Sequence, residues 1–179
     1  GVAIGALAAA FNVSVTAAQT LSRDTHVLVR FGLAGLVCGV LACAVPEVMG
    51  VGYDTVEAAL QGSLPLMLLV TIIIAKFVAS TACVGFGLPA GLIAPTLVMG
   101  ATAGALLGAL GHAAAPELSS SPGLYAMLGM GAMMGAVLQA PLAALMAILE
   151  LTANVNIILP GMVCIVSATL TCLAVFKRD

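Results

Sequence analysis

Charged residues are scarce in this sequence: Asp, Glu, Lys and Arg make up 7% of its 179 residues, whereas a soluble domain carries about 25%. Hydrophobic residues account for 63%, and the mean hydropathy is +1.26. A soluble chain of this length has too much surface for its volume to hide so many apolar side chains. The composition therefore excludes an ordinary soluble domain and predicts an integral membrane protein whose outer face is covered by lipid.

Aromatic residues and runs of like charge are also few. Trp is absent and Tyr occurs twice, so the aromatic belt common at membrane interfaces is weak. The net charge is −2, and no basic run offers the phosphate contacts that nucleic-acid binding requires. Nucleic acid is therefore not an expected partner.

The residue patterns of common metal and catalytic sites are missing. The sequence has no HExxH motif, no Cys/His ligand pair and no GxSxG motif. The cysteines include no CxxC pair, and their place in or beside apolar runs favours packing between helices over a metal or redox site. They are Cys38, Cys43, Cys83, Cys164 and Cys172. We expect no metal, no cofactor and no enzymatic activity; the alternative, an intramembrane enzyme, would need a Ser/His or carboxylate pair facing one cavity.

What the sequence has in abundance is apolar runs near the ~20 residues that span a bilayer. These runs cover residues 1–20, 27–45, 64–84, 92–113 and 157–176. Shorter runs at 124–139 and 142–151 are separated by Pro141, and a short amphipathic piece lies within 50–62. Short helices interrupted by Pro or Gly are typical of transporter binding sites. We therefore predict an all-α, polytopic membrane protein with broken helices, forming one transmembrane region over residues 1–179.

Basic residues and small residues add two predictions about how the helices are arranged. Cytoplasmic loops are rich in Lys and Arg, which places four basic residues on one side of the membrane: Arg23, Arg30, Lys177 and Arg178. Stripes of glycine at helical spacing let helix backbones approach closely in lipid. Such stripes are Gly35 with Gly39, and Gly100 with Gly104 and Gly108. The methionines at 127, 130, 133 and 134 are likewise expected to pack in the protein rather than to bind copper.

The most informative stretch is residues 87–95, GLPAGLIAP, which we call the glycine–proline segment. Its glycines permit sharp turns and close approach of a ligand, and Pro95 suits the first turn of a helix. The amides of that turn have no partner within the helix, and the helix dipole is positive there. A helix start inside the membrane is thus a ready anion site, and irregular backbone there must be buried in protein or line a cavity.

A second informative stretch contains a carboxylate, Glu150, followed by Leu151, Thr152, Ala153 and Asn154. Charges inside a membrane are expensive, so Glu150 is either a proton relay or ion ligand, or a carboxylate at a helix end. We favour the second interpretation, in which Glu150 bonds to the turn around Thr152 and Asn154.

These two stretches are similar to motifs of the CLC family of chloride channels and chloride/proton exchangers. Residues 87–95 resemble the family's GxFxP selectivity segment with its lead-in. Residues 141–160 resemble its PL…ELT.N…ILP stretch, and Val51-Gly52-Tyr53 after Pro46 resembles its glycine-rich turn. The pieces occur in the family's order and cover nearly the whole sequence.

The resemblance implies a specific site and specific partners. Chloride or a similar anion would be bound by the backbone amides of Leu92 and Ile93, within the selectivity segment of Gly91, Ala94 and Pro95. Ile93 stands where the family usually has Phe, which reshapes the wall beside the ion but keeps the amide. The chain would be the second of two inverted halves, and a homodimer would form through the helices at 142–151 and 157–176.

Several alternatives stay open from the sequence. The family's anion-binding serine and gating glutamate have no counterpart here, so a channel and a chloride/proton exchanger are both compatible. Another secondary transporter with broken helices, or a non-transporting membrane fragment, would share the composition. The first residue is Gly1 rather than Met, and we expect a piece of a longer protein. We expect it in a plasma membrane or a bacterial inner membrane.

Overall fold

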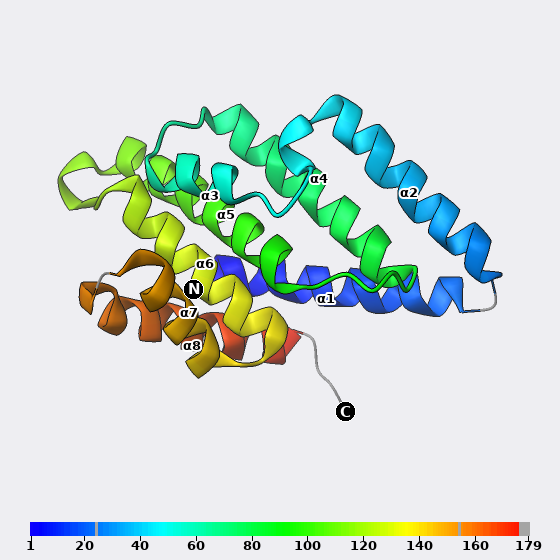
Figure 1. The fold of residues 1–179 in the computed structure, drawn as a ribbon. Coiled ribbons are helices and arrows are strands. Elements are labelled where there is room, and N and C mark those ends of the chain that lie inside the picture. The colour runs from blue at the N-terminus through cyan, green and yellow to red at the C-terminus, as the bar shows by residue number, and fades with distance from the viewer. Residues whose placement is uncertain (24, 154, 176–179) are drawn as a thin grey trace.

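The structure is a computed structural model that describes residues 1–23, 25–153 and 155–175. The described chain is helical, without strands (Figure 1). Its α-helices are α1 Val2–Ser22, α2 Val27–Ala44, α3 Tyr53–Leu60, α4 Leu66–Gly85, α5 Ile93–Ala114, α6 Pro122–Leu138, α7 Pro141–Thr152 and α8 Ile158–Val175. Three 3-10 turns, η1 Pro46–Val48, η2 Pro116–Leu118 and η3 Val155–Ile157, join them. The all-α prediction is confirmed.

Five of these helical stretches are long and apolar enough to cross a membrane. They are α1, α2, α4, α5 and the stretch Val155–Val175 that contains α8. Helices α6 and α7 have 17 and 12 residues and fall short of the ~20 that a span requires. The predicted spans and the two shorter helices agree with the structure, with ends displaced by at most two residues.

The centre of the fold is the pair α5 and α6, which lie side by side in Figure 1 and make the most extensive contact between helices. Glycine allows this approach, because a Cβ atom at Gly104 would collide with the Tyr125 carbonyl oxygen and one at Gly100 with that of Gly129. The predicted stripe on α5 is therefore a packing surface. Met130 and Met133 of α6 are fully buried in the core, which confirms the packing role of the methionines.

Helix α2 differs from its neighbours because little of this chain covers it. Ala34 is its only buried residue, and space is open around the Cβ positions of Gly35 and Gly39. The predicted close helix contact at this second stripe is thus not made within the described chain. Helix α2 packs mainly on α4 and η1, and most of its residues remain exposed in the described chain.

Candidate functional site

The candidate site is built on the break between α4 and α5. Helix α4 closes with two backbone bonds that define a Schellman turn: Gly87 N–H donates to the Val84 carbonyl (3.1 Å) and Leu88 N–H to that of Cys83 (2.9 Å). Gly87 lies at φ +82°, a conformation that costs other residues about 1–2 kcal/mol. The glycine is therefore what lets the chain leave α4 and turn toward α5.

Helix α5 begins at Ile93, so Pro95 falls in its first turn as predicted. Thr96 N–H makes the first backbone bond, to the Leu92 carbonyl at 3.1 Å. Within the described chain, the amides of Leu92, Ile93 and Ala94 donate to no backbone carbonyl. Helix α5 has 22 residues, and its dipole adds positive potential at these donors. The start of α5 thus has the chemistry of an anion site.

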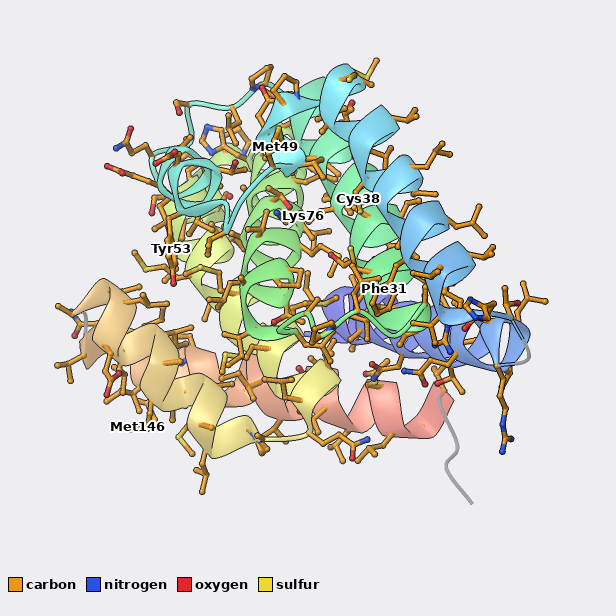
Figure 2. All side chains as sticks on the ribbon, turned by 45° about the vertical axis from the view of Figure 1, so that its right-hand side comes forward. Phe31, Cys38, Met49, Tyr53, Lys76 and Met146 are labelled. Carbon is orange, nitrogen blue, oxygen red and sulfur yellow. The ribbon has the colours of Figure 1, made fainter. Side chains whose placement is uncertain are left out.

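A cavity of about 530 Å³ adjoins this helix start. Ala90, Gly91, Ala94 and Pro95 form one wall, and residues of α2, α4 and the 48–51 loop form the others. Figure 2 shows Cys38, Met49 and Lys76 around this space. Irregular backbone was expected either to be buried in protein or to line a cavity, and Ala90 and Gly91 of the glycine–proline segment line this cavity.

The structure brings three of the five predicted site residues to this cavity: Gly91, Ala94 and Pro95. The Leu92 side chain packs instead against the buried cluster that contains Phe11 and Met99. The Ile93 side chain is 54% exposed. Since the predicted contribution of Leu92 and Ile93 is their backbone N–H groups, the positions of these side chains do not conflict with it.

Comparison with known proteins identifies the family. The family described as "Voltage gated chloride channel" matches residues 1–173 of this chain. The chain belongs to this family. Together with the five candidate spans, this makes it part of a multi-pass membrane protein.

Several relatives of this chain are exchangers by name. The H(+)/Cl(-) exchange transporter ClcA of Salmonella agona (strain SL483) is 33% identical over 177 residues, which cover 95% of this chain and 37% of the relative. The transporter of the same name in Salmonella arizonae is 32% identical over the same length. The chain thus spans less than half the length of these relatives.

The fold also matches a solved structure, the crystal structure of a slow cyanobacterial Cl−/H+ antiporter. The TM-score is 0.88 at 24% sequence identity, and the match covers 99% of this chain and 44% of that one. This likeness supports the predicted CLC-type arrangement of broken and tilted helices.

Lys76 also lies at this site, although the sequence had not indicated a role for it. It lies in the middle of α4, is 5% exposed, and donates from Nζ to the carbonyls of Val48 (2.9 Å) and Gly50 (3.0 Å). Among the described residues that line the cavity, it is the only charged one. A single Lys inside a long apolar run was the available signal, because such residues mark functional or tightly bonded positions in membrane proteins.

The loop held by Lys76 is the glycine-rich turn predicted after Pro46. Gly50 and Gly52 both have positive φ, at +67° and +84°. In this member of the chloride channel family, the ammonium group thus bonds a tight turn to the wall of the cavity.

Two cysteines also meet at the cavity, which the sequence spacing did not indicate. The Sγ atoms of Cys38 on α2 and Cys83 on α4 are 3.3 Å apart, and both residues line the cavity. Cys172 is buried and accepts a hydrogen bond from Asn12 Nδ2 at 3.7 Å. The packing interpretation thus suits Cys172, and no group of three potential metal ligands occurs among the described residues.

Glu150 lies away from the cavity-lining residues, exposed near the end of α7. The Thr152 hydroxyl donates to the Ile148 carbonyl at 2.6 Å, so the expected bond between Glu150 and Thr152 is not made. The other expected partner, Asn154, lies outside the described residues. Lys177 and Arg178, two of the four basic residues predicted to lie on one side of the membrane, are also outside the described residues.

Proposed function

We propose that the protein containing this chain moves chloride or a similar anion across a membrane, and that the amides of Leu92 and Ile93 bind the anion. The observation that carries the proposal is the start of α5: its first amides donate to no backbone carbonyl in the described chain, and the flanking residues Gly91, Ala94 and Pro95 line a cavity. An anion at a helix start is attracted by oriented N–H groups and the helix dipole. The matched family and the names of its members agree with an anion as the substrate.

Binding by backbone amides suits transport because conduction requires an ion to leave as well as to enter. A full positive charge at the site would hold the anion more tightly. Within the cavity the charged group is Lys76, whose Nζ already donates to two carbonyls. The glycine–proline segment therefore supplies a binding site of moderate strength.

Residues 1–179 form a single transmembrane region in this proposal, and a first half of the same protein is its partner. The chain covers 37% of the relatives that it matches, and α2 leaves most of its surface uncovered. The lipid bilayer surrounds the assembly, in a plasma membrane or a bacterial inner membrane. No nucleic acid takes part, and the activity is transport without a cofactor rather than enzymatic conversion.

A homodimer forms through α7 and α8 in this proposal. Large apolar side chains lie exposed along both helices: Leu142, Met146, Leu159, Val163 and Leu170. The structural neighbour and the curated relatives carry names of Cl−/H+ exchangers, which favours exchange over a channel for the whole protein.

The test uses the whole protein in liposomes loaded with chloride, with efflux followed by a chloride electrode. Ile93 is the first residue of α5, where proline removes an N–H group without a helical partner. Proline there also disfavours the αR conformation of the preceding residue, Leu92 (φ −84°, ψ −17°). We expect Ile93→Pro to lower apparent chloride affinity about tenfold, the effect of losing ~1.4 kcal/mol. Ile93→Leu, which keeps the amide, is the matched control and should stay within twofold of the unmodified protein.

A backbone ester at position 93, made by incorporating the α-hydroxy acid, removes the N–H while keeping the side chain. It separates loss of the donor from any distortion caused by proline. Unchanged chloride affinity in the ester protein would show that this amide does not bind the anion. Absence of chloride flux in the unmodified protein would refute the proposed activity itself.

A further inference from the structure

The C-terminal end of α4 has a complete set of hydrogen bonds to its last carbonyl groups. The backbone itself serves three of them, because Phe86, Gly87 and Leu88 donate to the carbonyls of Ala82, Val84 and Cys83. The carbonyls of Gly85 and Phe86 remain. In lipid such groups need partners, because no water replaces a missing bond.

Two side chains, one from the end of α1 and one from the start of α2, donate hydrogen bonds to these remaining carbonyls. The hydroxyl of Ser22, buried at the end of α1, donates to the Gly85 carbonyl at 3.0 Å. Arg30, half-buried in the first turn of α2, donates from Nε to the Phe86 carbonyl at 2.9 Å. Segments more than 50 positions apart in sequence thus close the end of α4.

Arg30 also lies against Gly87, the residue that turns the chain. A Cβ atom at Gly87 would come within 2.5 Å of Arg30 Nη2. Arg30 thus contacts both residues that begin the connection to α5: it bonds the backbone of one and packs on the other. The remaining connection is short, since only residues 88–92 lie between Gly87 and the start of α5.

We propose that Arg30 is a positioning residue for the anion site, acting through the Phe86 carbonyl to fix the turn that leads to the amides at the start of α5. This inference rests on the proposed anion transport. It differs from the expectation drawn from the sequence, in which Arg30 counted only as a basic residue marking one side of the membrane. The directed Nε–H bond carries the role, and the positive charge is secondary.

Three substitutions in the whole protein separate the bond from the charge. Glutamine places an N–H donor where arginine has Nε but carries no charge. Methionine has similar length without a donor, and lysine keeps the charge but places its only donors one atom further out. Arg23, exposed at the C-terminal end of α1, provides the charge control Arg23→Gln.

The measurements are the apparent KM for chloride, the flux ratio of nitrate to chloride and the melting temperature, all in reconstituted or detergent-solubilised protein. We expect Arg30→Met to raise KM about tenfold and to change the flux ratio, and Arg30→Lys to behave similarly. Arg30→Gln should remain within threefold of the unmodified protein, and Arg23→Gln should have no effect.

Two results would overturn the proposal. Equal defects in the Gln and Met variants, with normal behaviour of the Lys variant, would show that charge rather than the directed bond matters. A lower melting temperature in Arg30→Met with unchanged KM and flux ratio would show a structural role alone.

A readout without transport separates this inference from the proposed function. Hydrogen exchange at the amides of Gly87 and Leu88 should accelerate at least fivefold in Arg30→Met and remain slow in Arg30→Gln. If the unmodified protein moves no anion, the proposed function fails, whereas this exchange pattern still shows whether Arg30 holds the turn. Unchanged exchange in Arg30→Met would refute the positioning role.

Discussion

Cys38 and Cys83 place their Sγ atoms 3.3 Å apart across the contact between α2 and α4, at the wall of the cavity. Disulfides have Sγ–Sγ distances of about 2.05 Å, so the two sulfur atoms would have to approach by a further ~1.3 Å to bond. Cys83 also supplies the carbonyl that accepts the Leu88 amide. The pair therefore lies directly beside the turn that leads to the proposed anion site.

We predict that hydrogen peroxide joins Cys38 and Cys83 in the whole protein. One thiol is oxidised to a sulfenic acid with release of water, and the second thiol displaces the hydroxyl as a second water to form the disulfide. The measurement is the number of free thiols, counted by maleimide–polyethylene glycol gel shift before and after reduction. Oxidation should remove two reactive thiols together, and a reductant should restore both.

Cysteine-to-serine variants control the cross-linking experiment. In Cys38→Ser and in Cys83→Ser the reversible loss of a thiol pair should disappear. Cys43 is an exposed cysteine on α2, the helix that carries Cys38, and Cys43→Ser should leave the paired loss intact. Persistence of the paired loss in Cys38→Ser would assign it to other cysteines and contradict the prediction.

Replacing Lys76 with Met should destabilise the protein. The ammonium group serves the carbonyls of Val48 and Gly50 inside the fold, and each buried acceptor left without a donor costs about 1–3 kcal/mol. We expect the free energy of unfolding to fall by at least ~2 kcal/mol, measured by denaturant titration in detergent. The matched control is Ile74→Met on the exposed side of α4, which should change stability little; equal stability of the two variants would mean that the 48–51 turn does not depend on Lys76.

Substitution of Gly104 by Ala should force α5 and α6 apart. Its Cβ atom would meet the backbone of Tyr125, which cannot move as freely as a side chain end, and such overpacking costs about 1–3 kcal/mol. Thermal unfolding of the purified protein measures the change. Gly111→Ala adds the same atom on the same helix, where the nearest neighbour, Ser119 Oγ, would lie 3.8 Å away. It should leave the melting temperature unchanged or raise it through better helix propensity. Equal melting temperatures for Gly104→Ala and Gly111→Ala would show that α5 and α6 do not depend on the close contact at Gly104.

The sequence predicted the helices well because the lipid environment makes one rule dominant. A spanning segment must satisfy its own backbone and present apolar side chains, so the long runs coincide with α1, α2, α4, α5 and α8. The glycine–proline segment also predicted a helix start near Leu92, one residue from the start observed at Ile93, since Gly and Pro act on the local backbone. The stripe on α5 was predicted by the same periodicity, but the identical pattern on α2 has no partner within the described chain.

Polar contacts between residues far apart in the chain could not be predicted from the sequence. The bonds from Ser22 and Arg30 to the end of α4 join residues 63 and 56 positions apart, and Cys38 meets Cys83 across 45. Glu150 was given a bond to the turn at Thr152, but its side chain is exposed and the Thr152 hydroxyl bonds within its own helix. Nothing in local spacing distinguishes a helix-end carboxylate that turns inward from one that points outward.

By itself, the sequence determined a membrane-spanning, all-α chain with an interrupted helix pair and a helix start suited to an anion, because these follow from hydropathy and from backbone constraints at Gly and Pro. The tertiary structure alone decided which distant groups close the end of α4, which side chains face the cavity, and which glycine stripe is a packing surface. Those relationships depend on how the helices cross, and each rests on a contact between residues that are far apart in the sequence.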